Sequence, residues 1–318
     1  MRGGLCFGST GFKCRIPYSG TSSVTEDFQD LQDFEKLNIN WFPGHMRKAL
    51  RGVGDQIKRV DVVLELRDAR LPVTSQNPDL QNLLINKPSL ILFNKSGLAD
   101  PNQIKKWESK LKNESTKPFL FVDVKRRKGL SQIIPSSRKL MQTRWENLRQ
   151  RGIRPPVLRL MVIGMPNVGK SSLINALARR GATQTGPKPG VTRHQEWIVL
   201  GQNAELLDTP GILWPKIQNT IDGLNLTLIG GIRDEIVGVE SLADYLIQLG
   251  KKRFPQKLLE RYTIEGCRVQ SSQEILHQIA IKRGFFRTGG NVDIQRVSEM
   301  LLHDFREGLF GPITLDQL

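Results

Sequence analysis

The stretch Leu158-Arg-Leu-Met-Val-Ile-Gly164-Met-Pro-Asn-Val-Gly169-Lys170-Ser171-Ser172 decides the fold of this 318-residue chain. Its apolar first half predicts a buried strand, and the glycine-rich turn that follows opens a helix. The two glycines let backbone N–H groups curl around a phosphate at the helix N-terminus. In this P-loop pattern we expect Lys170 to reach the β- and γ-phosphates and the Ser171 hydroxyl to bind Mg²⁺. The expected phosphate-binding set also includes Asn167, Val168, Gly169 and Ser172.

Two downstream segments fit a nucleotide switch. In Leu206-Leu207-Asp208-Thr209-Pro210-Gly211, which ends a short apolar strand, Asp208 can hold Mg²⁺ through water and the Gly211 N–H can sense a γ-phosphate. Thr192, in Pro189-Gly190-Val191-Thr192, lies between the P-loop and this segment as the threonine that closes on Mg²⁺. In this order after a P-loop, the segments indicate a GTPase.

The segment expected to read the base precedes the P-loop. Asn94-Lys95-Ser96-Gly97 follows the apolar strand 89–93, and Phe121-Val122-Asp123-Val124-Lys125 follows the next predicted strand. Asn94 and Lys95 are therefore expected to bind the nucleotide. In the usual numbering of GTPase motifs, the P-loop is G1, the segment of Thr192 is G2 and the segment Asp208–Gly211 is G3. Asn94-Lys95 would be G4, and the segment after the next strand G5. The order in this chain is therefore G4-G5-G1-G2-G3, a circular permutation. The same sheet can form because permutation moves only the chain ends, which are surface features.

The flanking sequence predicts an α/β fold followed by helices. Apolar runs at 60–66, 89–93 and 119–124 alternate with helical patterns at 44–59, 102–112 and 131–150. Such alternation predicts a parallel, doubly wound sheet covered on both faces. Beyond Pro215 the pattern is helical, with a stripe comprising Ile294, Val297, Leu301, Phe305 and Leu309. We expect an N-terminal segment over 1–38, the GTPase domain over 39–215 and a helical domain over 216–318.

Composition excludes several classes of protein. Hydrophobic residues make up 38% and charged residues 25% of the chain, so most of it can bury a core. No apolar run is long enough to span a membrane. Three scattered cysteines are too few for a disulfide framework or a zinc cage, which indicates a reducing compartment.

The net charge of +16 is concentrated in the first two thirds of the chain. Residues 1–215 hold 34 basic and 18 acidic residues, whereas 216–318 hold 13 of each. Within 117–159 there are 12 basic residues against two acids. A one-sided block of this kind indicates nucleic acid rather than anionic lipid, because no amphipathic helix with an aromatic face accompanies it. The candidates for phosphate contacts, each with a solvated surface role as the alternative, are Arg126, Arg127, Arg138 and Arg144.

The first 25 residues contain no acid and three basic residues among many Ser, Thr and Gly. This composition suits an organelle transit peptide, and a plain disordered terminus is the alternative.

Several motifs together resemble the circularly permuted YlqF/RbgA-type GTPases, including their mitochondrial members. They are Trp41-Phe-Pro-Gly-His45-Met46, Asp68-Ala69-Arg70, Pro189-Gly-Val-Thr192 and the end Asp304-Phe-Arg-Glu-Gly-Leu-Phe-Gly311. The resemblance covers about residues 38–318. It implies a monomeric GTP hydrolase that acts late in large ribosomal subunit assembly, with rRNA and ribosomal proteins as partners. It also implies an RNA-binding role for the helical domain 216–318. The implied location is the mitochondrial matrix, at the inner membrane through the ribosome, with a bacterial cytoplasm or a plastid as the alternative.

The resemblance also implies roles for two further residues. It places the family's catalytic histidine at His45, which would handle the attacking water because Ile212 stands where Ras-like enzymes carry glutamine. It places at Asn167 the asparagine that potassium-activated GTPases use to ligate K⁺. The implied cofactors are GTP, Mg²⁺ and K⁺. The alternatives are a surface or capping role for His45 and a turn role for Asn167, while Asp68 and Arg70 are expected to form an ion pair in a loop.

The base-reading segment departs from the family. Gly97 stands where the family has an aspartate that accepts hydrogen bonds from guanine, and Asp123-Val124-Lys125 replaces the usual Ser-Ala-Lys. Losing that carboxylate is expected to weaken discrimination against ATP. The alternative function is therefore a nucleotide-gated RNA-binding scaffold with vestigial hydrolysis and relaxed purine specificity.

Overall fold

The computed structural model describes residues 45–181, 197–201, 203–207, 217, 219–264 and 270–318. The N-terminal segment over 1–38 and the domain boundary near 215 lie outside the described residues. The first described helix of the C-terminal part begins at Thr220, so that part of the predicted division stays a prediction.

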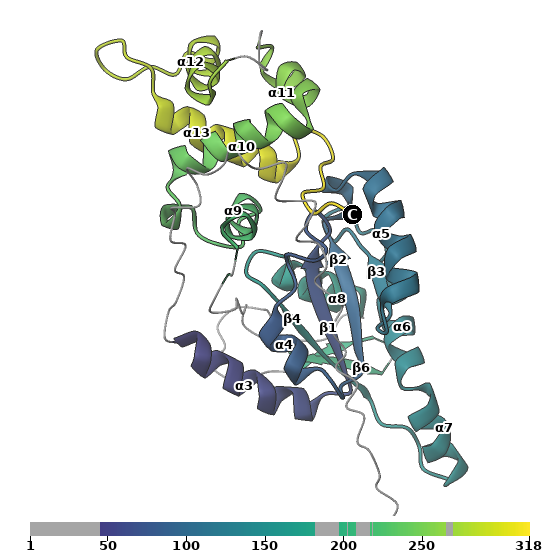
Figure 1. The fold of residues 1–318 in the computed structure, drawn as a ribbon. Helices are drawn as coiled ribbons and strands as arrows, with labels where there is room; N and C mark the ends of the chain where they lie inside the picture. The colour runs from purple at the N-terminus through teal and green to yellow at the C-terminus, as the bar shows by residue number, and fades with distance from the viewer. Residues whose placement is uncertain (1–44, 182–196, 202, 208–216, 218, 265–269) are drawn as a thin grey trace, which may run out of the picture.

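The described elements alternate between strands and helices up to β4 and are helical from Thr220 onward (Figure 1). In chain order the helices and strands are α3 (His45–Arg59), β1 (Val62–Asp68), α4 (Pro78–Leu83), β2 (Ser89–Asn94), α5 (Pro101–Glu114), β3 (Phe119–Phe121), α6 (Ile133–Leu140), α7 (Gln142–Gln150), β4 (Leu158–Gly164), α8 (Lys170–Gly181), β5 (Trp197–Leu200), β6 (Ala204–Leu207), α9 (Thr220–Leu228), α10 (Val239–Arg253), α11 (Pro255–Tyr262), α12 (Ser272–Arg283) and α13 (Ile294–Glu307).

The strands form one six-stranded sheet in the order β3-β2-β1-β4-β6-β5. The pairs β3-β2, β2-β1, β1-β4 and β4-β6 are parallel, as the sequence predicts. The edge strand β5 runs antiparallel to β6, so the expectation of a wholly parallel sheet is wrong at this edge. The connection over 201–203 is too short for a crossover, and a short connection joins neighbouring strands only in antiparallel order.

Helices cover both faces of the sheet, which confirms the doubly wound arrangement. One face packs Val63, Met161 and Ile163 against α3 and α4, and Ile91 and Phe93 against Trp107 of α5. On the other face, side chains such as Leu64, Leu160 and Val162 share a cluster with residues of α6 and α8. Every residue of β1 is buried, as expected for a central parallel strand covered on both sides.

Two elements differ from the sequence expectation in length. The third strand ends at Phe121 because the backbone of Asp123 pairs instead with that of Lys128, which turns the chain back on itself. The helix expected over 131–150 is two helices, α6 and α7, which meet at Met141.

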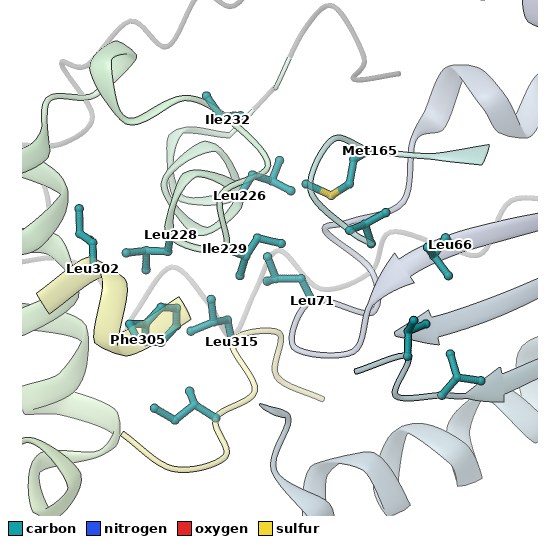
Figure 2. Packing of buried hydrophobic residues seen from close by; sticks show 14 of the residues in the cluster. Leu66, Leu71, Met165, Leu226, Leu228, Ile229, Ile232, Leu302, Phe305 and Leu315 are labelled. Carbon is teal, nitrogen blue, oxygen red and sulfur yellow. The ribbon is translucent and has the colours of Figure 1, made fainter. Parts of the chain in front are cut away.

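The helices after Thr220 pack on a shared core and on the sheet domain. Val297, Leu301 and Phe305 form the predicted stripe of α13, whereas Leu309 lies beyond its end and is 48% exposed. Figure 2 shows the junction, where Leu226 and Ile229 of the α9 region approach Met165 and Leu71 of the sheet domain, while Leu228 faces α13. Leu315, near the C-terminus, belongs to the same cluster. The two parts therefore share a continuous apolar core.

Candidate nucleotide-binding site

The P-loop joins β4 to α8, as its sequence predicts. The side chain of Val168 is buried in the core and anchors the loop, while Ser171 and Ser172 in the first turn of α8 are exposed. The Lys170 side chain is 8% exposed, and its Nζ donates to Met165 O at 2.7 Å and to Gly164 O at 3.1 Å. The lysine thus lies against the backbone carbonyls at the start of the loop, and a bound phosphate would replace them as its partner.

Asn94 connects the P-loop to the loop that follows β3. Its Nδ2 donates to Val168 O at 2.8 Å, and its Oδ1 accepts from Val124 N at 3.1 Å. The amide lies so close to Gly169 that a Cβ there would collide with it, and Gly169 also has a φ of 104°, which favours glycine. The structure therefore brings together the ends of β2, β3 and β4, as the permuted motif order predicts.

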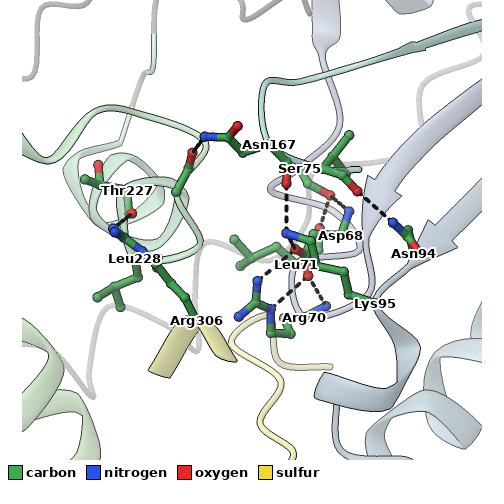
Figure 3. Close-up of polar contacts among 12 residues, drawn as sticks. Asp68, Arg70, Leu71, Ser75, Asn94, Lys95, Asn167, Thr227, Leu228 and Arg306 are labelled. Atoms are coloured by element: carbon green, nitrogen blue, oxygen red, sulfur yellow. Dashed lines mark hydrogen bonds and ion pairs between the residues drawn. The ribbon is translucent and has the colours of Figure 1, made fainter. Parts of the chain in front are cut away.

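Lys95 links the same loops through its side chain. Its Nζ donates to Asn167 O at 2.9 Å and lies 3.2 Å from Asp68 Oδ2 (Figure 3). Its backbone is left-handed, with a φ of 59°, which turns the chain sharply after β2. The lysine is thus held between β1 and the P-loop, beside the phosphate-binding turn.

Asp68 and Arg70 form the predicted ion pair, and both side chains are buried. Arg70 Nε donates to Asp68 Oδ1 and Arg70 Nη2 to Asp68 Oδ2, each at 3.0 Å. Burial alone would raise the pKa of Asp68, but the charges of Arg70 and Lys95 outweigh it and hold that pKa well below its usual range. The Arg70 guanidinium also lies 5.7 Å from the ring centroid of Phe305, so the pair supports the contact with the helical domain.

Asn167 connects the P-loop to the helical domain. Its Nδ2 donates to Gly230 O at 2.7 Å, and its backbone has a φ of 57° (Figure 3). The turn that carries Gly230 is held in place by Arg306 of α13, which donates to Leu228 O and pairs with Asp234. The phosphate-binding loop and the C-terminal helices are therefore in direct polar contact, a feature that the sequence did not reveal.

The loop after β3 contains a carboxylate whose place the sequence did not predict. Asp123 Oδ2 accepts from Gly97 N at 3.0 Å, and Asp123 Oδ1 accepts from Arg126 N at 2.9 Å. The residue is 4% exposed, and Arg126 lies over it with Nη1 donating to Gly97 O at 3.2 Å. The only signal in the sequence was the pair of departures at residues 97 and 123, which the structure shows to be neighbours.

The other predicted site residues cannot be placed by their side chains. His45 begins α3, but its side chain lies outside the described residues, as do Thr192, Asp208 and Gly211 entirely. In the described part of the chain, no group of three His, Cys, Asp or Glu side chains could hold a metal ion. No helix among the described residues is long and apolar enough to cross a membrane.

Most of the predicted phosphate contacts are exposed. Arg126, Arg127 and Arg144 are at the surface, with Arg144 Nη1 3.5 Å from Asp61 Oδ1, whereas Arg138 of α6 is half-buried and is a weaker candidate. In the helical domain, Lys251 donates to Gln270 O and Arg253 donates to Leu315 O, so both side chains stabilise the folded structure.

The fold and this site define a circularly permuted P-loop GTPase. The family model described as "50S ribosome-binding GTPase" matches residues 159–262. Ribosome biogenesis GTPase A of Bacillus pumilus is 37% identical over 281 residues, which cover 88% of this chain and 99% of the relative. Mitochondrial ribosome-associated GTPase 1 of Mus musculus is 35% identical, over 87% of this chain and 90% of the relative. The structure of GNP-bound YlqF from T. maritima matches with a TM-score of 0.55 and 26% identity, over 82% of this chain and 94% of that chain. The chain belongs to the family of YlqF/RbgA-type ribosome biogenesis GTPases and is a GTP hydrolase.

Proposed function

We propose that this GTPase binds the large ribosomal subunit through its rRNA and promotes a late step of assembly in mitochondria. GTP-bound protein would engage the subunit, and hydrolysis would release it. The observation that carries the proposal is the contact between the P-loop and the helical domain at Asn167 and Gly230. Through it, a change at the phosphates acts directly on the domain that would bind RNA.

The described residues fit a bound nucleotide. The exposed Ser171 hydroxyl at the start of α8 is a hard oxygen ligand of the kind Mg²⁺ prefers, and Lys170 faces the loop carbonyls. In this proposal Thr192 and Asp208 complete the Mg²⁺ set, and Gly211 senses the γ-phosphate. The bound metal would neutralise phosphate charge during hydrolysis.

Two further roles belong to the same proposal. His45 would position or deprotonate the attacking water, since Ile212 has no polar atom for this task. Asn167 would ligate K⁺ through Oδ1, because the hydrogen bond to Gly230 O uses only Nδ2. Ligating the ion and holding the helical domain are thus compatible functions of one side chain.

Charge and relatives support the partner and the location. The block 117–159 presents exposed basic side chains along α7 and the segment after it, which suits an rRNA backbone. One relative is named as a mitochondrial ribosome-associated protein, and the acid-free first 25 residues suit a transit peptide. Placement in the matrix, at the inner membrane through the ribosome, and a monomeric state are part of the proposal.

Phosphate release and nucleotide exchange with purified large subunits test this function. We expect the subunits to stimulate turnover by wild-type protein, and His45→Ala to lower that turnover about 10²-fold while GTP binding stays near normal. Lys170→Ala is the control that removes nucleotide binding itself. A rate of turnover that does not change when subunits are added would refute the proposed partner. Equal turnover in wild type and His45→Ala would show that His45 has a structural role.

A scaffold with vestigial hydrolysis is the second candidate, and the glycine at residue 97 is the observation that favoured it. The same assay separates the two functions. A scaffold would bind subunits in a nucleotide-dependent way, but the subunits would not stimulate its phosphate release.

A further inference from the structure

We infer that Asp123 reads the guanine base in place of a side chain at residue 97. The inference rests on the proposed nucleotide site and names its specificity-determining residue. It predicts strict recognition of guanine, in contrast to the relaxed purine specificity expected from the sequence. The carboxylate that reads the base would lie in the loop after β3 instead of the loop after β2.

The first argument is the place of the carboxylate. In open α/β sheets ligands bind beyond the carboxyl ends of the strands, and here Asn94 holds the loops after β2 and β3 against the P-loop. Asp123 lies in the second of these loops and contacts Gly97 in the first. A nucleotide whose phosphates occupy the P-loop would therefore extend its base toward these two loops.

The second argument is that Asp123 occupies the space of a missing side chain. A Cβ added at Gly97 would lie 2.5 Å from Asp123 Oδ2 and would also collide with the Arg126 guanidinium. A side chain at residue 97 thus requires Asp123 Oδ2 and the Arg126 guanidinium to leave the positions that they hold here. The glycine and the aspartate are two parts of one exchange rather than two independent departures.

The third argument is the number of acceptor sites that remain. A carboxylate offers about four lone-pair sites. Asp123 uses one on each oxygen, for Gly97 N and for Arg126 N. One site on each oxygen is left, which matches the two adjacent donors of guanine, N1–H and the N2 amino group. Adenine has an acceptor at N1 and no amino group at C2, so it would leave the carboxylate unpaired.

The other described carboxylates near these loops have different partners. Asp68 is buried against Arg70 and Lys95, and Asp100 caps α5 by accepting from Asn102 N. Glu307 pairs with Lys125 on the surface. Arg126 covers Asp123 from the solvent side, but its side chain is exposed and an exposed arginine changes rotamer readily.

Competition binding of purine triphosphates against a fluorescent GDP analogue tests the inference on the full chain. Wild type is expected to bind GTP at least about 10²-fold more tightly than ATP or XTP. Asp123→Asn replaces one acceptor by a donor, which suits the C2 carbonyl of xanthine and not the amino group of guanine. We therefore expect the variant to lose about 10-fold or more in GTP affinity, gain in XTP affinity and invert the preference.

The double variant Gly97→Asp/Asp123→Ser returns the carboxylate to the first loop and is expected to prefer GTP over ATP again. The single variant Gly97→Asp is expected to bind all three nucleotides poorly, because the two carboxylates collide. Lys170→Ala is the control, since it should lose GTP, ATP and XTP alike whatever group reads the base.

Each outcome decides a separate claim. An Asp123→Asn protein that keeps the wild-type ratio of GTP to XTP would overturn the assignment of Asp123. Unchanged nucleotide binding in Lys170→Ala would instead refute the nucleotide site itself. If Asp123→Asn does not fold, the double variant decides, because equal GTP and ATP affinities there would overturn the inference. Wild-type protein that binds GTP and ATP equally would overturn it with no variant at all.

Discussion

Asn94 Nδ2 donates to Val168 O at 2.8 Å across 74 positions of sequence. This bond joins the loop after β2 to the phosphate-binding loop, although the first precedes the second in the chain. The bond holds the base-reading segment against the P-loop, as in a GTPase whose motifs follow the usual order. The permutation therefore changes the order of these segments along the chain but not their contact.

The bond predicts a specific loss on substitution. Asn94→Ala should weaken GTP binding about 10- to 10²-fold, because Val168 O and Val124 N each lose a buried partner, at about 1–3 kcal/mol each. Titration with a fluorescent guanine nucleotide measures the effect. Asn77→Ala is the matched control: Asn77 is equally buried and caps α4, so its loss should cost about 1 kcal/mol of stability and leave affinity unchanged. Equal affinities in the two variants would show that Asn94 does not organise the site.

Sequence alone predicted the parts of this site that depend on local pattern. The P-loop, the strand before it and the strand before Asn94 each follow from a short apolar run and the turn after it. The antiparallel strand β5 was missed because its apolar run, Trp197–Leu200, is only four residues long and does not by itself indicate a strand or its direction.

The contacts between loops could not be predicted in this way. Asp123 meets Gly97 only because the backbone turns at Lys95 and again between Asp123 and Lys128. Asn167 meets Gly230 only because the helical domain packs on the P-loop. Neither juxtaposition has a local signature, since each depends on how separate elements pack.

The Asp68–Arg70 pair yields a prediction about stability. Arg70→Met should lower the free energy of unfolding by about 3–5 kcal/mol, since it leaves the buried Asp68 carboxylate with only Lys95 as a charged partner. Urea denaturation measures this value. Lys58→Met removes an exposed pair with Asp55 and should change the same quantity by no more than about 1 kcal/mol. A small effect of Arg70→Met would mean that Lys95 alone compensates for Asp68.

The C-terminal residues predict a dependence of stability on pH. Asp316 Oδ2 accepts from Val73 N and Thr74 N, and Oδ1 accepts from Thr74 Oγ1 at 2.6 Å, which fixes the end of the chain to the loop after β1. Burial raises the pKa of this carboxyl from 3.8 to about 6, outweighing these hydrogen bonds, and Asp222 raises it further.

Because the folded-state pKa lies above the unfolded one, the stability that Asp316 contributes is complete below about pH 4 and is lost as the pH rises through 6. The variant Asp316→Asn cannot titrate at this position. The free energy of unfolding of wild type, relative to that of the variant, should therefore fall by at most about 2 kcal/mol over this pH range. The limit is set by solvent, which screens part of the effect because the residue is only partly buried. Thermal denaturation from pH 4 to 7 measures the difference. Asp55→Asn, at an exposed position, should follow wild type throughout. Parallel plots of stability against pH for wild type and Asp316→Asn would show that the pKa of this carboxyl does not change on folding.

The last prediction concerns the basic block. Lys139 at the end of α6, Arg149 of α7 and Arg151 just after α7 are exposed, and Figure 1 shows that α7 lies away from the loop that follows β2. If they contact rRNA phosphates, binding releases counterions and weakens steeply with salt, by about 0.7–0.9 units of logarithmic slope per contact. Reversing all three to Glu should therefore weaken binding to large subunits and flatten the salt slope by about two to three units, with GTP affinity unchanged. Sedimentation with subunits between about 50 and 200 mM KCl measures both quantities.

The matched control reverses the same number of charges on α5, at Lys105, Lys106 and Lys110. That helix also carries Glu108 and Glu114, and a face of mixed sign is typical of plain solvation. The α5 variant should keep the wild-type slope, so any difference between the two triple variants reports position rather than net charge. Equal losses in both would indicate a long-range field of the whole protein. Wild-type binding in the α7 variant would move the rRNA contact to another surface, and the helical domain beyond Thr220 would be the next to test.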